Sequence, residues 1–402
     1  MKADLVVTGA SQVVTCDPTF GEGPLGVIDR GAVAGFEGRV VWTGPERELR
    51  DAVEVAPDAH EVDAAGGAVL PGLVDCHTHL VFAGDRSEEF AARLRGEPYT
   101  GGGISTTVAA TRATSDDELE ALAHHRLDRF LEHGVTTVEA KSGYGLTSEH
   151  ERRLLEIAVR LDAPAEVVRT FMGAHVVPVE YADAVDSYVT LVAEGMIPGL
   201  GNLAEFCDVW CDEGAFTPKQ CRQILRAAKA EGLGIKVHAE QLSRSGGAAL
   251  AAEFGAVSAE HLEHANEEDA DALARSHTIG VLMPGASLMT SQPFAPARML
   301  IERGVRVALS TDFNPGTSYS ENLQLVVALA CAHLKMTPEE ALLGITRYGA
   351  AALSREGRVG SLAPGARADL LVLETRSYVD MAYHYGVNLA RAVVTGRAPR
   401  GN

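Results

Sequence analysis

The sequence predicts an α/β fold: a (β/α)8 TIM-like barrel with a small β-sandwich domain built from both chain termini. Two observations carry this prediction. Strand-like and helical runs alternate through the middle of the chain, and short β-rich runs occur at its two ends. Such alternation implies parallel strands joined by crossover helices, for which an eight-stranded barrel is the natural closure. We expect the sandwich to comprise residues 1–66 and 355–402, and the barrel residues 67–354.

In residues 4–65, short β-rich runs are separated by Gly, Pro and Asp turns, which is typical of small antiparallel sheets. These runs are residues 5–7, 12–15, 27–28, 32–34 and 39–42. The same pattern of short β-rich runs occurs again only at residues 360–362, 368–373 and 387–394. Because a different pattern lies between, we expect the two ends to form one small domain with the larger domain inserted between them.

The middle of the chain contains eight apolar runs suited to buried strands. They are residues 69–76, 134–140, 165–172, 206–211, 234–238, 256–261, 280–283 and 305–310. Amphipathic helical patterns lie between them, at residues 115–133, 148–161, 182–194, 217–231, 245–254, 267–274 and 295–303. A barrel of this kind has its active site at the C-terminal ends of the strands, so polar residues that follow these runs are candidate functional residues.

Composition narrows the possible partners. The chain has 402 residues, of which 46% are apolar, and a formal net charge of −20. This charge argues against nucleic acid or an anionic membrane as a partner, but it permits a small anionic substrate held by a few arginines. The absence of a signal-peptide pattern and of a long apolar span predicts a cytoplasmic protein. Six cysteines are too few for a disulfide scaffold and fit a reducing compartment.

A candidate metal site begins at the first apolar run of the middle region. His77 and His79 point the same way along an extended strand, so the two imidazoles can chelate one divalent metal. His238 and Asp312 also follow apolar runs, and together the four groups suit zinc, iron or a similar ion. At a barrel mouth an open coordination position can hold water, whose pKa falls toward about 7 when it is bound to zinc.

Other polar residues near the expected mouth suggest further roles. Asp312 lies where an apolar run meets a polar turn, and it could contact the metal with one oxygen and accept a proton with the other. His261 could hydrogen-bond the metal-bound water or a substrate oxygen. Arg86 follows the first metal-binding run closely and could pair bidentately with a carboxylate. Residues 101–103 form a Gly-Gly-Gly run without the spacing of a phosphate loop, and we expect a loop near the mouth.

Several longer motifs identify a family. They are residues 71–79 (PGLVDCHTH), 139–146 (EAKSGYGL), 171–175 (FMGAH), 238–242 (HAEQL) and 311–317 (TDFNPGT). With these motifs the chain resembles the amidohydrolase superfamily and, within it, the imidazolonepropionase family. The resemblance implies a cytoplasmic hydrolase that opens the ring amide of 4-imidazolone-5-propanoate to give N-formimidoyl-L-glutamate in histidine degradation. It also implies one bound metal ion, zinc or iron.

The resemblance assigns roles residue by residue. The implied metal ligands are His77, His79, His238 and Asp312. The implied substrate-binding residues are Arg86, Tyr144, His175, Gln241, Asn314, Gly316 and Thr317. For catalysis we expect Asp312, His261 and Gln241. Some family members carry Glu where this chain has Gln241, and an amide cannot act as a general base at neutral pH, so Asp312 and His261 would carry the protons and Gln241 would orient the substrate.

Several alternatives remain open from the sequence. Glu240, next to Gln241, could take part in proton transfer. Lys141 could be carbamylated and bridge two metals, although an electrostatic role is the expectation for a mononuclear site. Another amidohydrolase activity, such as deamination of a nucleobase or related ring, would use the same metal set, and a relative without activity would have lost a ligand. We expect a homodimer.

Overall fold

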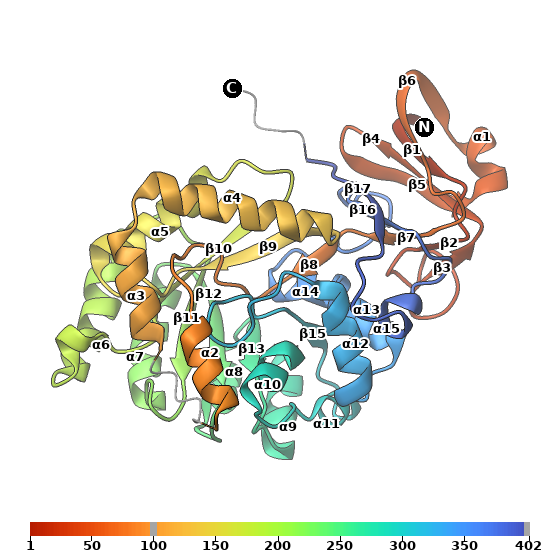
Figure 1. Ribbon diagram of the computed structural model, residues 1–402. Coiled ribbons are helices and arrows are strands. Elements are labelled where there is room, and N and C mark those ends of the chain that lie inside the picture. The colour runs from red at the N-terminus through yellow and green to blue at the C-terminus, as the bar shows by residue number, and fades with distance from the viewer. Residues whose placement is uncertain (97–102, 398–402) are drawn as a thin grey trace.

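The computed structural model describes residues 1–96 and 103–397. Gly101 and Gly102 of the predicted loop, and residues 398–402 of the predicted small domain, lie outside the described residues. A barrel forms the larger part of the molecule, and smaller sheets lie at one side of it (Figure 1).

Eight parallel strands form the barrel sheet, and they are hydrogen-bonded in sequence order. They are β8 (Leu73–Asp75), β9 (Val135–Lys141), β10 (Glu166–Ala174), β11 (Phe206–Cys211), β12 (Gly234–Ala239), β13 (Ser258–His261), β14 (Ile279–Leu282) and β15 (Val307–Leu309). Just beyond the first and last strands, a parallel bridge joins Thr78 to Phe313. This arrangement confirms the predicted (β/α)8 barrel.

Helices surround the barrel, and each strand is therefore covered on its outer face. They are α2 (Ser87–Leu94), α3 (Ile104–Ala113), α4 (Asp116–Glu132), α5 (Ser148–Arg160), α6 (Val185–Thr190), α7 (Pro218–Ala230), α8 (Gly247–Phe254), α9 (Glu267–Ser276), α10 (Pro284–Thr290), α11 (Ala297–Glu302), α12 (Leu323–His333), α13 (Pro338–Gly344) and α14 (Arg347–Ala352). The helix predicted over residues 182–194 is shorter, because α6 passes into a π-helical turn over Leu191–Met196.

Two smaller sheets form the rest of the molecule. One has the order β5-β4-β1-β6 and the other β17-β16-β7-β2-β3. Their strands are β1 (Lys2–Thr8), β2 (Gln12–Val14), β3 (Val27–Asp29), β4 (Gly31–Phe36), β5 (Arg39–Pro45), β6 (Glu54–Asp63), β7 (Ala68–Pro71), β16 (Leu370–Leu373) and β17 (Ala390–Val394). Short helices α1 (Leu49–Ala52) and α15 (Asp380–Tyr383) complete the elements. In Figure 1 the blue strands β16 and β17 lie beside red and orange strands, so both chain ends contribute to these sheets.

The small sheets share an apolar core. Val7 and Val33 from one sheet pack in the same buried cluster as Val13, Leu370 and Val372 from the other. Strand β6 was not predicted from the sequence, because its side chains are mostly exposed and polar and show no apolar alternation. The β-rich run at residues 360–362 is not a strand, although Leu362 is buried in the same core.

The strand predicted over residues 69–76 is two strands. β7 pairs with β2 and β16 in the small sheet, whereas β8 begins the barrel. Gly72 separates them, and a Cβ there would lie 2.2 Å from the hydroxyl oxygen of Thr136. Glycine therefore allows the chain to pass closely between the two sheets, and the apolar run alone did not reveal the change of sheet. Among the described helices, none has the length and apolar character needed to cross a bilayer.

Candidate metal centre and active site

The structure brings the four predicted metal ligands together at the C-terminal end of the barrel. The ring centroids of His77 and His238 are 4.5 Å apart, and that of His79 lies 6.1 Å from His77 and 6.3 Å from His238. Asp312 follows β15, and its Oδ1 lies 3.5 Å from Nε2 of His77. All four side chains are buried.

His261, predicted for proton transfer, has its ring centroid 5.4 Å from that of His77 and 5.1 Å from that of His238, closer than His79 is to either. One ring nitrogen from each of His77, His238 and His261 lies within 4.8 Å of the others. His261 Nδ1 is 3.6 Å from Glu263 Oε1. Burial opposes protonation of His261, but the carboxylates of Glu263 and Asp312 raise its pKa on balance. His261 can therefore carry a proton beside the candidate ligands.

The candidate ligand rings turn the same nitrogen toward the protein. His77 Nδ1 lies 2.7 Å from Glu260 Oε2, and His238 Nδ1 lies 2.9 Å from Asp208 Oδ2. His79 Nδ1 lies 3.1 Å from the carbonyl oxygen of Ser142. Acceptors placed behind Nδ1 hold the proton there and leave Nε2 for a metal.

The residues present fit a metal ion. Burial lowers the pKa of His77, His79 and His238 well below the usual range, which favours the neutral, ligating form. Within the described part of the chain, neither ring nitrogen of His77 forms a hydrogen bond of ordinary geometry, but Nδ1 faces the Glu260 carboxylate and Nε2 does not. Three imidazoles and a carboxylate form a donor set that suits zinc or iron.

A network of buried charges lies beneath the histidines. Lys141 Nζ lies 2.7 Å from Asp208, 2.9 Å from Glu260 and 3.1 Å from Glu139. Lys236 Nζ lies 2.9 Å from Glu139 and 3.1 Å from Glu260. Burial disfavours a charged lysine, but these carboxylates raise the pKa of Lys141 well above its usual value. An ammonium group surrounded by three carboxylates favours the electrostatic role of Lys141 over a carbamylated, metal-bridging one.

Sequence reasoning missed most of this network. A signal was present, because the charged residues occupy alternate positions of runs otherwise suited to buried strands. Glu139 and Lys141 alternate on β9, as Lys236 and His238 do on β12. Side chains two residues apart on a strand share a face, and the inner face of a barrel strand is enclosed.

Asp312 lies in an environment suited to proton transfer. Burial raises its pKa to about 6, against the opposing influence of His261 and of hydrogen bonds from its loop. Its Oδ2 accepts a hydrogen bond of 2.8 Å from the Thr317 hydroxyl. Asp312 has φ of 53° and His261 has φ of 78°, left-handed conformations that are uncommon outside glycine and that occur often at functional sites.

A pocket opens beside these groups. It is lined by His79, Arg86, Ile104, Tyr144, His175, Trp210, His238, Gln241, His261, Asp312, Asn314 and Thr317. Of the predicted substrate-binding residues, only Gly316 does not line it.

Glu240 and Gln241 face in different directions. Strand alternation would place Glu240 beside His238, but Glu240 has φ of 55°, which reverses the chain at the end of β12. Its carboxylate accepts hydrogen bonds from the backbone nitrogens of Ser245 and Ala248 where α8 begins. Gln241 lines the pocket instead. Glu240 therefore has a structural role, and it does not reach the pocket.

The loop after β9 carries Tyr144 into the pocket. Its backbone N–H groups at Gly143, Gly145 and Leu146 all donate to the buried carboxylate of Glu151. The Tyr144 ring lies 5.2 Å from that of His79. One carboxylate on α5 thus fixes the shape of this loop.

His175 packs directly on a candidate metal ligand. Its ring stacks on His79 at 4.9 Å between centroids, and its Nδ1 lies 3.0 Å from the carbonyl oxygen of Gly143. Burial lowers the pKa of His175 to about 4, so the imidazole is neutral near pH 7. Its Nε2 can therefore form a hydrogen bond with a ligand, but the ring brings no positive charge to the pocket.

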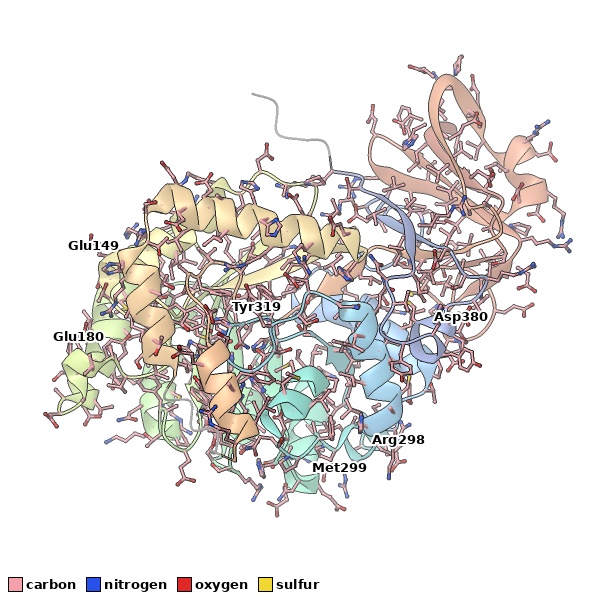
Figure 2. All side chains as sticks on the ribbon, viewed as in Figure 1. Glu149, Glu180, Arg298, Met299, Tyr319 and Asp380 are labelled. Atoms are coloured by element: carbon pink, nitrogen blue, oxygen red, sulfur yellow. The ribbon has the colours of Figure 1, made fainter. Side chains whose placement is uncertain are left out.

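Arg86 reaches the pocket, but one edge of its guanidinium group already pairs with a carboxylate. Its Nε and Nη2 donate to Glu89 at 2.7 and 2.8 Å. A Cβ on Gly316 would lie 2.1 Å from Arg86 Nη1, so any larger residue there would displace the guanidinium. Gly316 lines a neighbouring apolar cavity together with Tyr319, whose exposed ring is labelled in Figure 2.

Asn314 and Thr317 shape the loop after β15. Asn314 Nδ2 donates to the Thr317 hydroxyl and to the carbonyl oxygen of Asp312, both at 2.6 Å. Its Oδ1 accepts from the backbone nitrogens of Gly316 and Thr317. These contacts use the hydrogen-bonding groups of the Asn314 amide within the loop, so the residue positions Asp312 and Thr317 against the pocket.

Comparison with known proteins gives the family. Residues 68–401 match the model of the amidohydrolase family. An imidazolonepropionase from Geobacillus kaustophilus is 48% identical over 92% of this chain and 90% of its own length. Another, from Salinispora arenicola, is 46% identical over 99% of both chains. The chain belongs to the imidazolonepropionase family of amidohydrolases.

A solved structure supports the fold. The crystal structure of an adenosine deaminase from Xanthomonas campestris with bound zinc has a TM-score of 0.74 to this chain. It is 18% identical, and the similarity covers 99% of this chain and 93% of that one. At this low identity the comparison shows only that the two proteins share the same fold. The family assignment therefore rests on the sequence relatives.

Proposed function

We propose that this chain is an imidazolonepropionase, which hydrolyses the ring amide of 4-imidazolone-5-propanoate to N-formimidoyl-L-glutamate in histidine degradation. The observation that carries this conclusion is the similarity, over nearly the full chain, to imidazolonepropionases that are 46–48% identical. The enzyme is a hydrolase acting on a carbon–nitrogen bond of a cyclic amide. Water supplies a hydroxyl group to the carbonyl carbon and a proton to the departing nitrogen.

The metal would be held by His77, His79, His238 and Asp312, and it would be zinc or iron. The three Nδ1 atoms all face oxygen atoms of the protein, which supports this set because the Nε2 atoms are then the ones available to a metal. A bound divalent ion polarises a carbonyl group and lowers the pKa of water.

Proton transfer is assigned to Asp312 and His261. The Asp312 carboxylate lies at the pocket, where burial raises its pKa, and it can take a proton from the attacking water. It can then deliver that proton to the departing ring nitrogen. His261, whose pKa is raised by Glu263 and Asp312, can donate a hydrogen bond to the carbonyl oxygen as negative charge develops there. Gln241 lines the same pocket and can orient the ring through its amide.

Substrate binding is assigned to the remaining pocket groups. Arg86 supplies positive charge for the propionate, and Gly316 allows the guanidinium to approach the loop after β15. Tyr144 and the neutral His175 contact the ring from the loop after β9 and the end of β10. Asn314 and Thr317 complete the side of the pocket nearest Asp312.

Turnover of imidazolonepropanoate tests the proposal. The purified protein should release N-formimidoyl-L-glutamate, whereas guanine and cytosine should yield no ammonia. Metal analysis should find about one zinc or iron ion per chain, and the His77→Ala variant should lose both the metal and the activity. Deamination of a nucleobase in place of ring opening would overturn the assignment.

We also propose a cytoplasmic homodimer that acts on a small anionic substrate and binds neither nucleic acid nor membrane. All six cysteines are free thiols, and five of them are buried, which supports a reducing compartment. The net charge of −20 supports the absence of polyanionic partners. Light scattering coupled to size-exclusion chromatography would measure the oligomeric state, and a mass near 42.5 kDa would contradict the dimer.

A further inference from the structure

Trp210 is a pocket residue to which the family resemblance gives no role. It lies on β11, two residues after Asp208, whose carboxylate points to His238 inside the barrel. Alternation along the strand places Trp210 on the same inner face, nearer the mouth. Its backbone is also in register with His238 on the neighbouring strand. The indole ring lines the pocket and is 4% exposed.

The polar atom of this side chain has no partner. Among the described residues, none accepts a hydrogen bond from the buried indole Nε1 of Trp210. The indole N–H can only donate, so an acceptor must come from elsewhere to satisfy it. Buried polar groups are nearly always hydrogen-bonded, and a buried donor that lacks a partner is costly. Because this indole lines the pocket, a bound ligand could supply the missing hydrogen-bond acceptor.

The neighbours of Trp210 indicate which part of the ligand it meets. Its ring centroid is 6.0 Å from that of His175, which stacks on the candidate metal ligand His79. The reacting amide must lie beside the metal ligands, whereas the propionate is assigned to Arg86. A neutral N–H donor on the metal side therefore suits an uncharged acceptor of the ring, either the carbonyl oxygen or the imine nitrogen.

We propose that Trp210 binds the substrate directly and donates its indole N–H to an acceptor on the imidazolone ring. This inference rests on the proposed function, because the ring is the substrate of that reaction. It adds a specificity contact: an acyclic compound with the same carboxylate would bind to Arg86 without engaging the indole.

Substitution tests the contact while keeping an aromatic ring at this position. Trp210→Phe retains an aromatic ring and removes the N–H, and we expect kcat/KM to fall about tenfold, as for the loss of one hydrogen bond to a neutral group. The phenyl ring is smaller than the buried indole, so its melting temperature should fall by a few degrees, and kcat/KM is measured well below that temperature. Trp42→Phe, on β5 of the small sheets, is the matched control and should leave kcat/KM unchanged.

A spectroscopic measurement separates binding from packing. The chain has two tryptophans, so a protein labelled with ¹⁵N-tryptophan gives two indole signals, which Trp42→Phe assigns. Hydantoin-5-propanoate, a ring analogue with the same side chain, should move the Trp210 signal downfield and leave the Trp42 signal in place. Glutarate, which carries carboxylates but no ring, should not move it.

The outcomes distinguish the two proposals. If the wild type opens the ring, but Trp210→Phe retains full kcat/KM and the indole signal does not respond to the analogue, the contact is refuted and the proposed function stands. A movement of the signal with glutarate as large as that with the analogue would also refute a ring contact. If the wild type fails to turn over imidazolonepropanoate, the proposed function fails, and the inference falls with it.

Discussion

Glu260 Oε2 lies 2.7 Å from His77 Nδ1, so a fully buried carboxylate holds the ring of a candidate metal ligand. The same oxygen lies 2.9 Å from Lys141 Nζ. The carboxylate therefore connects the histidines at the barrel mouth to the lysines below them. A carboxylate behind a ligand ring fixes the orientation of the ring and makes its Nε2 a better metal ligand.

Glu260→Gln should weaken metal binding about 10- to 100-fold, because the amide can no longer serve as a charged acceptor for His77. Competition with a chromophoric chelator would measure the affinity. Glu253→Gln is the control, since Glu253 forms an exposed pair with Arg222 on the protein surface. Equal metal affinity in Glu260→Gln and the wild type would contradict this role.

Lys141→Met should destabilise the protein by about 3–5 kcal/mol, because it leaves the buried carboxylates around Nζ without their cation. Urea unfolding followed by circular dichroism would measure the change. Lys219→Met, at an exposed position of α7, should be neutral. A loss below 1 kcal/mol for Lys141→Met would show that Lys236 alone balances the carboxylates.

Glu151→Gln should alter the loop that carries Tyr144. The amide provides one acceptor oxygen for three backbone N–H groups, so we expect a loss of about 1–3 kcal/mol in stability. We also expect KM to rise more than kcat falls, since Tyr144 is assigned to substrate binding. Glu149→Gln, on the same helix and labelled in Figure 2, is exposed and should have no effect on either quantity.

Gly316→Ala should raise KM by at least about tenfold, because displacing a charge-assisted pair costs roughly 1.5–3 kcal/mol. The added methyl group would lie 2.1 Å from Arg86 Nη1 and would push the guanidinium from its place. Steady-state kinetics would separate KM from kcat. Gly199→Ala meets only the flexible Arg152 side chain, at 3.1 Å, and should behave as the wild type.

The metal-free protein should lose stability as the pH falls from 6.5 toward 4, in part through His175. Burial lowers the pKa of His175 from 6.5 to about 4, so the unfolded chain takes up the proton first. The stabilisation is fully present above pH 6.5 and declines as the pH approaches 4, by up to roughly 3 kcal/mol. Urea unfolding in the presence of a chelator would record it.

His175→Gln should flatten this part of the pH profile, because glutamine does not titrate. His125→Gln, at an exposed position of α4, serves as the control and should retain the full slope. An unchanged slope in His175→Gln would show that other buried groups account for the loss.

The alternation of apolar and amphipathic runs determined the barrel, because enclosed parallel strands need continuous apolar stretches and their crossover helices need one apolar face. The motif with His77 and His79 determined where a metal site would begin, since side chains two apart on a strand share a side. The longer motifs determined the family. These three conclusions depend on short-range patterns in the amino-acid sequence.

Tertiary structure alone decided other points. The run at 69–76 divides between two sheets because its pairing partners, β2 and β16, come from the two ends of the chain. Glu240 leaves the pocket and Gln241 enters it because of a left-handed residue at the end of β12. The pairing of Arg86 with Glu89, and the ring of carboxylates around Lys141, arise from distances between side chains. The local sequence pattern specifies which face of a strand or helix a residue occupies. Which side chains it then contacts is decided only when the strands and helices pack together.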